Sequence, residues 1–150
     1  MTDNINLPEG GMTAYGAISE GAAIPVCPFC LENGKVEAFI TNELCFMMLT
    51  GDPVLRNSVM IIPRRHVSSL FDLTPEEWGA THELLLAARR QLDKAQPNGY
   101  SVGWNVHEVA GQTVPRAHLH VIGRYEDEPL AGKGIRHALR QPANARPGRD

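Results

Sequence analysis

The most informative segment of this chain is Gly111-Gln112-Thr113-Val114-Pro115-Arg116-Ala117-His118-Leu119-His120-Val121-Ile122. Residues 117–122 form a short apolar run between a proline and a glycine, which predicts a strand. Side chains alternate between the two faces of a strand, so His118 and His120 are expected to share one face. Leu119 and Val121 are expected to point the other way, into the core. The stretch therefore places two imidazoles side by side, next to a Gly-Gln-Thr turn able to bind an anion.

Length and composition fit a single globular domain. The chain has 150 residues, of which 43% are hydrophobic and 21% are charged, and its net charge is −3. That charge provides no general attraction to nucleic acids or to anionic membranes, so a phosphate ligand would need a local site. No apolar run reaches the roughly 18 residues of a membrane span. Residues 1–20 lack the pattern of a secretory signal, and three cysteines argue against a disulfide framework, so a cytoplasmic location is expected.

The chain outside this stretch predicts an antiparallel α+β fold. Apolar and β-branched runs predict strands at residues 36–41, 44–49, 59–62 and 100–106, in addition to 117–122. A helix is expected at about residues 74–95, because Thr74 is an N-cap, Pro75 takes the first helical position and Glu77 completes a capping box. Its apolar row is expected to contain Trp78, Leu85 and Leu92, with Ala80, Leu84 and Ala88 beside it. The Gly- and Pro-rich tail is expected to be loose, or ordered against a partner.

Three ordered motifs resemble those of the histidine triad (HIT) family of nucleotide hydrolases and transferases. Gly111-Gln112-Thr113-Val114 matches the segment that precedes the family's three alternating histidines, and His118 and His120 match the second and third of them. Residues 61–67 and 70–77 resemble the family's apolar strand, basic turn and helix start. Cys27-Pro28-Phe29-Cys30 resembles a cysteine pair near the start of many members. The resemblance covers roughly residues 27–125. It implies about five antiparallel strands with one main helix, usually in a homodimer.

Composition and the resemblance together predict three segments within the chain. Residues 1–22 are expected to be a flexible N-terminal segment, residues 23–125 the HIT domain, and residues 126–150 a C-terminal tail that is either loose or packed on the dimer partner.

A neutral imidazole is a competent nucleophile near pH 7, provided that a hydrogen bond to its second nitrogen orients the ring. The resemblance assigns attack on a nucleotide α-phosphorus to His118, with a backbone carbonyl near residues 105–107 as the orienting acceptor. The catalytic residues it implies are His118, His120 and Gln112. The nucleotide-binding residues it implies are Asn105, Gly111, Gln112, Thr113, Val114, Arg116 and His120.

Arg116 is where this chain departs from the family, because it stands at the position of the first histidine. If the strand extends that far, Arg116 shares the face of His118 and His120. A guanidinium can fork onto two phosphate oxygens but cannot ligate a metal. Two hypotheses follow: the side chain binds substrate phosphate, or it turns to solvent at the strand edge.

Cys27 and Cys30 have the spacing of half a zinc site. The resemblance implies His66 as a third ligand, but the family's fourth ligand is the first triad histidine, which is Arg116 here. His107 is the nearest substitute along the sequence. Three alternatives stay open: a structural zinc, two reduced thiols without metal, and redox chemistry of the Cys-x-x-Cys pair. No organic cofactor is expected.

Together these observations predict a HIT-family hydrolase or nucleotidyl transferase. It would cleave a phosphoanhydride or phosphoramidate at the α-phosphate of a purine nucleotide through a nucleotidyl-histidine intermediate. One alternative is a nucleotide-binding module with little turnover, because Arg116 replaces a family histidine. Another is a zinc-stabilised interaction domain. Neither a nucleic acid nor a membrane is expected as a partner.

Overall fold

A computed structural model describes residues 27–31 and 36–148 of the chain. Its strands are β1 (Ile40–Thr41), β2 (Cys45–Leu49), β3 (Ser58–Pro63), β4 (Gly99–Gly103) and β5 (Leu119–Arg124). The helices are α1 (Pro75–Leu92) and the short α2 (Arg136–Leu139). The predicted α+β class, with five antiparallel strands and one main helix, is therefore confirmed. The predicted N-terminal segment 1–22 lies outside the described residues.

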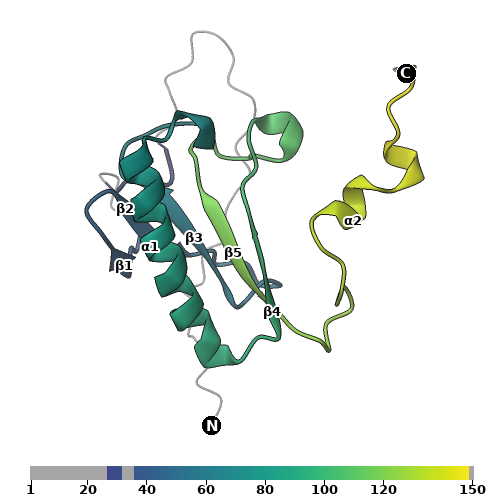
Figure 1. Cartoon of the computed structure of the whole chain (residues 1–150), viewed down its shortest axis with the longest axis horizontal. Coiled ribbons are helices and arrows are strands. Elements are labelled where there is room, and N and C mark those ends of the chain that lie inside the picture. The colour runs from purple at the N-terminus through teal and green to yellow at the C-terminus, as the bar shows by residue number, and fades with distance from the viewer. Residues whose placement is uncertain (1–26, 32–35, 149–150) are drawn as a thin grey trace.

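The sheet has the strand order β1-β2-β3-β5-β4, and every neighbouring pair is antiparallel. Helix α1 lies along one face of this sheet (Figure 1). Side chains on that face form the main core with the inner side of the helix: Cys45, Met47, Val59, Ile61, Leu119, Val121, Ala80, Leu84, Ala88 and Leu92. The inward direction predicted for Leu119 and Val121 is thus confirmed.

Strand β3 is buried along its whole length, which explains its β-branched, apolar sequence. Val59 and Ile61 face α1, whereas Met60 and Ile62 point to the opposite face of the sheet. There they pack in a second cluster with Phe29, Phe46 and Val114. The segment around Phe29 therefore covers part of the sheet face that α1 leaves open.

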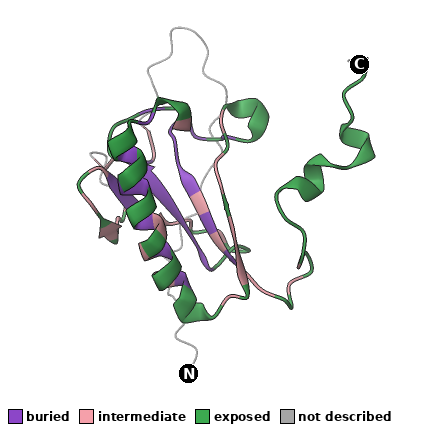
Figure 2. Cartoon of the chain, in the orientation of Figure 1, coloured by how far each residue is buried: buried purple, intermediate pink, exposed green. Residues whose placement is uncertain are grey.

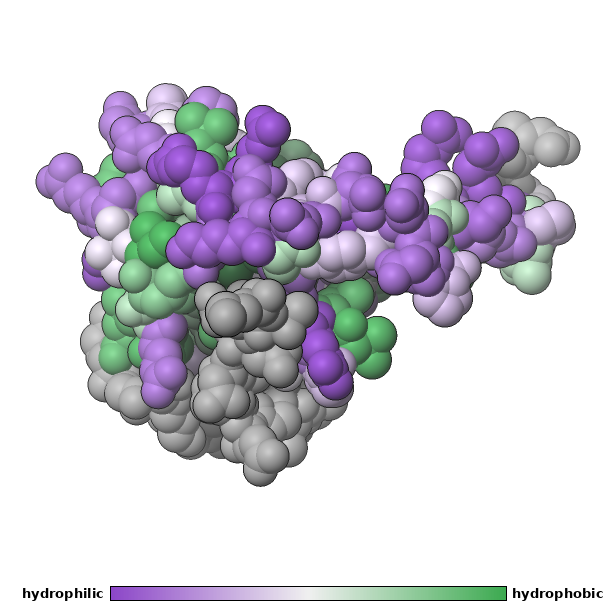
Figure 3. All heavy atoms as spheres, turned by 90° about the horizontal axis from the view of Figure 1, so that it is seen from below, coloured by the Kyte–Doolittle hydropathy of each residue, from purple (hydrophilic) through white to green (hydrophobic). Residues whose placement is uncertain are grey.

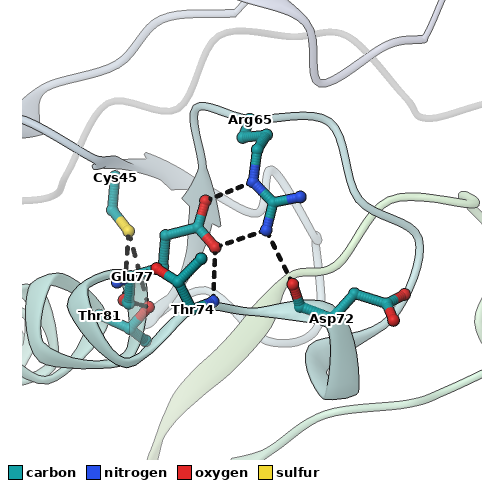
Figure 4. A network of polar contacts seen from close by, with 6 residues as sticks. All are labelled: Cys45, Arg65, Asp72, Thr74, Glu77 and Thr81. Carbon is teal, nitrogen blue, oxygen red and sulfur yellow. Dashed lines mark hydrogen bonds and ion pairs between the residues drawn. The ribbon is translucent and has the colours of Figure 1, made fainter.

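Helix α1 begins as its sequence predicts. The Thr74 side chain accepts from the Glu77 backbone N–H, and the Glu77 carboxylate accepts from the Thr74 N–H at 2.9 Å. The same carboxylate pairs with Arg65, whose guanidinium also donates to the Asp72 carbonyl (Figure 4). The pKa of Glu77 is lowered, first by the hydrogen bond from Arg65 and then by that from Thr74. The capping box thus also anchors the basic turn that follows β3.

The buried row of α1 differs from the prediction. It runs through Ala80, Leu84, Ala88 and Leu92, whereas Trp78 is exposed. The four buried residues are spaced by four, so they form one line along the helix that faces the sheet. Trp78 instead packs edge to face on Trp104, with ring centroids 5.9 Å apart.

All five predicted strands have different bounds in the structure, and three of them differ by two or more residues at one end. β1 is shorter than the predicted strand 36–41, although the Phe39 N–H still donates to the Met47 carbonyl. β4 ends at Gly103, not at residue 106, and β5 begins at Leu119, not at residue 117. The last two differences have one cause. Gly103 pairs with His120, so the residues beyond Gly103 would need partners in the segment before β5, which turns away at Val114–Arg116.

The C-terminal segment projects from the sheet and is largely exposed (Figures 1 and 2). Arg124 ties its first part to β5 by donating to the Leu130 carbonyl at 3.0 Å and to the Lys133 carbonyl at 3.2 Å. Beyond that, Ile135 lies against Gly103 of β4. Seen from below, most of the projecting surface is hydrophilic (Figure 3). Within the described residues, no helix combines the length and the apolar character needed to span a membrane.

Candidate active site

His118 and His120 lie together on the sheet face opposite α1. His120 pairs with Met60 of β3, whose side chain belongs to the cluster on that face. The two imidazole centroids are 4.8 Å apart with their planes at 78°. The predicted shared face of the two histidines is therefore confirmed, even though His118 stands one residue before β5.

A hydrogen bond orients the His118 ring. Its Nδ1 lies 2.7 Å from the carbonyl oxygen of Arg116, two residues earlier in the chain. A carbonyl can only accept, so Nδ1 carries the proton, and Nε2 of the neutral ring keeps its lone pair. The prediction that the acceptor lies near residues 105–107 is wrong. The segment before β5 turns back on itself and brings its own carbonyl to the ring.

The surroundings of the pair favour neutral imidazoles. Burial lowers the pKa of His118, and the hydrogen bond to the Arg116 carbonyl opposes this only in part. Burial also lowers the pKa of His120 to about 4, with a smaller contribution from the neighbouring His118. Phe29 adds to the apolar environment, because its ring stands edge-on to that of His118 with centroids 5.2 Å apart. Both imidazoles are thus ready to act as lone-pair donors near pH 7.

Gln112 braces the turn that precedes β5. Its side-chain amide donates to the Ser68 carbonyl at 2.7 Å, and its side-chain oxygen accepts from the His107 N–H at 2.7 Å. His107 has a φ of 66° and a ψ of 159°, a conformation found essentially only in glycine. Gly111 at the other end of this turn has a φ of 92°, which suits glycine.

The other predicted nucleotide-binding residues divide into two groups. Asn105, Gly111 and Thr113 are exposed, and the Asn105 side chain lies beside Gly111. Val114 is buried and packs with Phe29 and Phe46, so its side chain is not accessible to a ligand. Asn105, Gly111 and Thr113 are therefore accessible from solvent, whereas the Val114 side chain belongs to the core.

Arg116 fits neither hypothesis derived from the sequence. It is 2% exposed, which contradicts the solvent-directed side chain. Its guanidinium donates to the carbonyls of Pro63 and Arg64 and to the Cys30 sulfur, and therefore does not present a fork to a phosphate. Because Arg116 precedes β5, the alternation of a strand does not determine where its side chain points.

The predicted metal-ligating residues do come together. One donor atom each from Cys27, Cys30 and His66 lies within 4.8 Å of the others, so the three could form a metal site. His66 Nδ1 is 3.4 Å from the Cys30 sulfur. Among the described residues, His107 is not part of this group. The Arg116 guanidinium lies against the same sulfurs, with Nη1 2.8 Å from Cys30 and 4.0 Å from Cys27.

Sequence reasoning missed the residues that support the site. The carbonyls of Pro63, Arg64 and Ser68 accept from site side chains, and Phe29 packs on His118. Backbone acceptors carry no sequence signal. Phe29 lies inside the Cys-x-x-Cys motif, so its place near the histidines could be anticipated only from a fold that brings this motif to the sheet.

Comparison with known proteins agrees with this geometry. A sequence model described as the HIT domain matches residues 33–127. A bis(5'-adenosyl)-triphosphatase of Dictyostelium discoideum is 36% identical over 92 residues, which cover 59% of this chain and 60% of that protein. An uncharacterised HIT-like protein of Mycoplasma pneumoniae is 30% identical over 122 residues, 79% of this chain and 82% of its own length. A Zn-bound histidine triad family protein from Mycobacterium smegmatis has a similar structure, with a TM-score of 0.61 and 27% identity. The match covers 69% of this chain and 78% of that one.

Proposed function

This chain belongs to the HIT domain family, and on that premise we propose that it is a nucleotide hydrolase with His118 as its nucleophile. The observation that carries the proposal is the hydrogen bond between His118 Nδ1 and the Arg116 carbonyl. This bond keeps the Nε2 lone pair available and holds the ring in one orientation. The lowered pKa of His118 keeps that nitrogen unprotonated near neutral pH.

The proposed reaction has two displacements at the α-phosphorus of a purine nucleotide. In the first, the Nε2 lone pair forms an N–P bond while the bond from phosphorus to the bridging oxygen or nitrogen breaks, and the leaving group departs with that electron pair. In the second, a water oxygen attacks the same phosphorus and the N–P bond breaks. A nucleoside monophosphate leaves and His118 returns to its starting form. The water supplies the hydroxyl of the product, and its second proton balances the one taken up by the leaving group.

The other predicted residues have defined roles in this proposal. His120 lies beside the α-phosphate, 4.8 Å from His118 between ring centroids. Gln112, Gly111 and Thr113 present the turn to the phosphate or the leaving group, and Asn105 lies next to that turn. Gln112 makes two hydrogen bonds that shape the turn, so its contact with substrate is expected to exchange with one of them.

The substrate is proposed to be a dinucleoside polyphosphate or an adenosine phosphoramidate. Support for the first comes from the relatives named as bis(5'-adenosyl)-triphosphatases, one of them bifunctional with an adenylylsulfatase activity. The chain spans 60% and 49% of the length of these two relatives. The phosphoramidate is included because the nucleophile attacks phosphorus, and both substrates present the same α-phosphoryl centre.

The protein is proposed to act as a homodimer. Strand β4 is an edge of the sheet, and Val102 on it is exposed. Leu130, Ile135 and Leu139 of the C-terminal segment are also exposed. An edge strand and apolar side chains of this kind are suited to contact a second copy.

The test is covalent capture of the intermediate. Wild-type protein is mixed with diadenosine triphosphate or AMP phosphoramidate that is radiolabelled at the α-phosphorus, then quenched in base, which preserves N–P bonds. We expect label on the wild type and none on His118→Ala.

The His118→Ala variant should lose turnover while binding AMP within roughly tenfold of the wild type, because His118 acts in the chemical step. His82→Ala is the control, since His82 is exposed on α1, away from the site. Turnover by His118→Ala within a few-fold of wild type would show that His118 is not the nucleophile.

The same assay separates the alternatives. A nucleotide-binding module with little turnover would bind AMP but acquire no label from either substrate. An interaction domain would neither bind AMP nor acquire label.

A further inference from the structure

Arg116 is the largest fully buried side chain in the described part of the chain. Its Nη2 donates to the carbonyls of Pro63 at 2.7 Å and Arg64 at 2.9 Å. Its Nη1 lies 2.8 Å from the Cys30 sulfur and 4.0 Å from that of Cys27. The guanidinium carbon is also 5.9 Å from the centre of the Phe46 ring. A buried cation is tolerated only when polar groups surround it, and here both terminal nitrogens have partners, whereas Nε has none among the described residues.

These partners come from three separate segments of the chain. The two carbonyls belong to the end of β3 and the basic turn after it, and Phe46 belongs to β2. The sulfurs come from the Cys27–Cys30 turn, and the backbone of Arg116 leads into β5. One side chain therefore links the Cys-x-x-Cys turn to the centre of the sheet. A structural metal performs the same kind of cross-linking in small domains.

The residues do not fit a four-ligand zinc site. Zinc in a structural site takes four nitrogen or sulfur ligands in tetrahedral geometry. Only Cys27, Cys30 and His66 form such a group among the described residues, and the Arg116 guanidinium lies 2.8 Å from the Cys30 sulfur and 4.0 Å from the Cys27 sulfur. A guanidinium stays protonated and has no lone pair to offer. It also brings a fixed positive charge to within contact of a sulfur that the metal would need.

We propose that the Arg116 guanidinium takes the place of a metal ion in the Cys27–Cys30–His66 cluster. The cation that cross-links this part of the fold is then part of the chain itself, and the protein folds and works without zinc. It follows that Arg116→His should open the cluster to zinc, because an imidazole at this position adds a fourth ligand and removes the competing charge. This inference is independent of the nucleophile assignment, and either can fail without the other.

The test measures zinc and thermal stability together. Full-length protein is produced in zinc-supplemented medium and purified without chelator, and the metal is quantified by mass spectrometry. We expect wild type to hold less than roughly a tenth of an equivalent and to keep the same thermal midpoint after EDTA treatment. Arg116→His should hold about one equivalent, and EDTA should lower its midpoint by several degrees. Adding Cys27→Ser to Arg116→His should abolish the zinc content again.

A second variant covers the case in which Arg116→His does not fold. Arg116→Lys keeps a positive charge next to Cys30 but cannot fork onto both carbonyls, so it should be less stable than wild type and still free of zinc. Wild type with about one equivalent of zinc and a chelator-sensitive midpoint would overturn the proposal. So would zinc binding by Arg116→Lys, or a soluble Arg116→His that binds no zinc, since Arg116 would then not stand at the position of the metal.

Discussion

At the scale of single residues, the positions of His118 and His120 have a local cause, whereas the position of the Arg116 side chain depends on segments distant in sequence. The shared face of His118 and His120 follows from strand alternation, because both lie in or next to β5. The direction of Arg116 could not be predicted, because its N–H bonds to the Val114 carbonyl in a turn where the rule of alternation does not apply. Its partners are two backbone carbonyls and a sulfur distant in sequence, and such contacts depend on the complete fold.

His107 provides a test of local strain beside the site. Its φ of 66° and ψ of 159° cost a residue with a side chain roughly 1–3 kcal/mol, while glycine adopts them freely. His107→Gly should therefore raise the free energy of unfolding by roughly 0.5–2 kcal/mol after the entropy lost by glycine is subtracted. The measurement is urea unfolding. His107→Ala is the matched control, because it removes the imidazole but keeps the Cβ, and it should bring no gain. Equal gains in both variants would show that the imidazole, not the backbone, is the cause.

The two site histidines predict how stability depends on pH. Burial keeps the folded-state pKa of His118 below its ordinary value and that of His120 at about 4. Well above pH 6.5, the ordinary pKa of histidine, both are neutral in the folded and unfolded states, so their titration does not change the free energy of unfolding there. As the pH falls from 6.5 towards 4, the two imidazoles bind protons in the unfolded chain but remain neutral in the folded protein. The free energy of unfolding therefore falls.

For His120 alone the loss between pH 7 and pH 5 should be roughly 1–2 kcal/mol. Urea unfolding at both pH values should show a smaller loss in His120→Asn than in wild type. Other groups also titrate in this range, and the difference between the two proteins isolates His120. The acid limb of kcat/KM should likewise lie below pH 6.5, because the His118 nucleophile stays neutral. Identical pH profiles of stability for the two proteins would contradict the buried, neutral His120.

At the scale of elements, the features with local causes were predicted and those with distant causes were not. The capping box of Thr74 and Glu77 determines where α1 begins, and it was readable from residues three apart. The end of β4 and the start of β5 could not be predicted from the sequence, because each strand ends where the other no longer provides backbone hydrogen-bond partners. The ion pair between Glu77 and Arg65 could not be predicted either. It joins α1 to the basic turn after β3, and only the folded sheet brings that turn next to the helix.

Gly123 tests how closely β5 approaches the segment before β3. A Cβ at this position would lie 2.4 Å from the Asn57 side-chain nitrogen, which donates to the Leu92 carbonyl and the Tyr125 hydroxyl. Gly123→Ala should push Asn57 aside and lower the free energy of unfolding by roughly 1–3 kcal/mol. Gly79→Ala is the control: it lies inside α1 with open space around it, and it should raise stability by roughly 0.5–1 kcal/mol. Chemical unfolding of both variants measures these changes. A Gly123→Ala variant with the same free energy of unfolding as wild type would show that Asn57 moves aside without cost.

At the scale of the whole molecule, the sheet and α1 form a core that does not depend on the C-terminal segment. The buried residues of both core clusters lie between Phe29 and Val121. The segment after Gly134 carries α2, and its Ile135 and Leu139 remain more than half exposed. Apolar side chains on an otherwise hydrophilic extension are more consistent with a contact to another molecule than with a role in folding.

Truncation after Gly134 should therefore separate folding from self-association. Removing residues 135–150 eliminates the contact of Ile135 with Gly103 but none of the buried core residues, so a dilute, monomeric sample should keep its thermal midpoint within about 2 °C of wild type. If Ile135 and Leu139 cover a second copy, the truncated protein should dissociate at concentrations at least roughly tenfold higher than wild type, because about two apolar contacts per chain are lost. Sedimentation velocity over a range of concentrations measures this. The double variant Ile135→Ser, Leu139→Ser keeps the chain length and should reproduce the effect, whereas His137→Ser in the same exposed helix should not. Unchanged association in both the truncated protein and the double variant would assign self-association to other surfaces, with the edge strand β4 and its exposed Val102 as the next to vary.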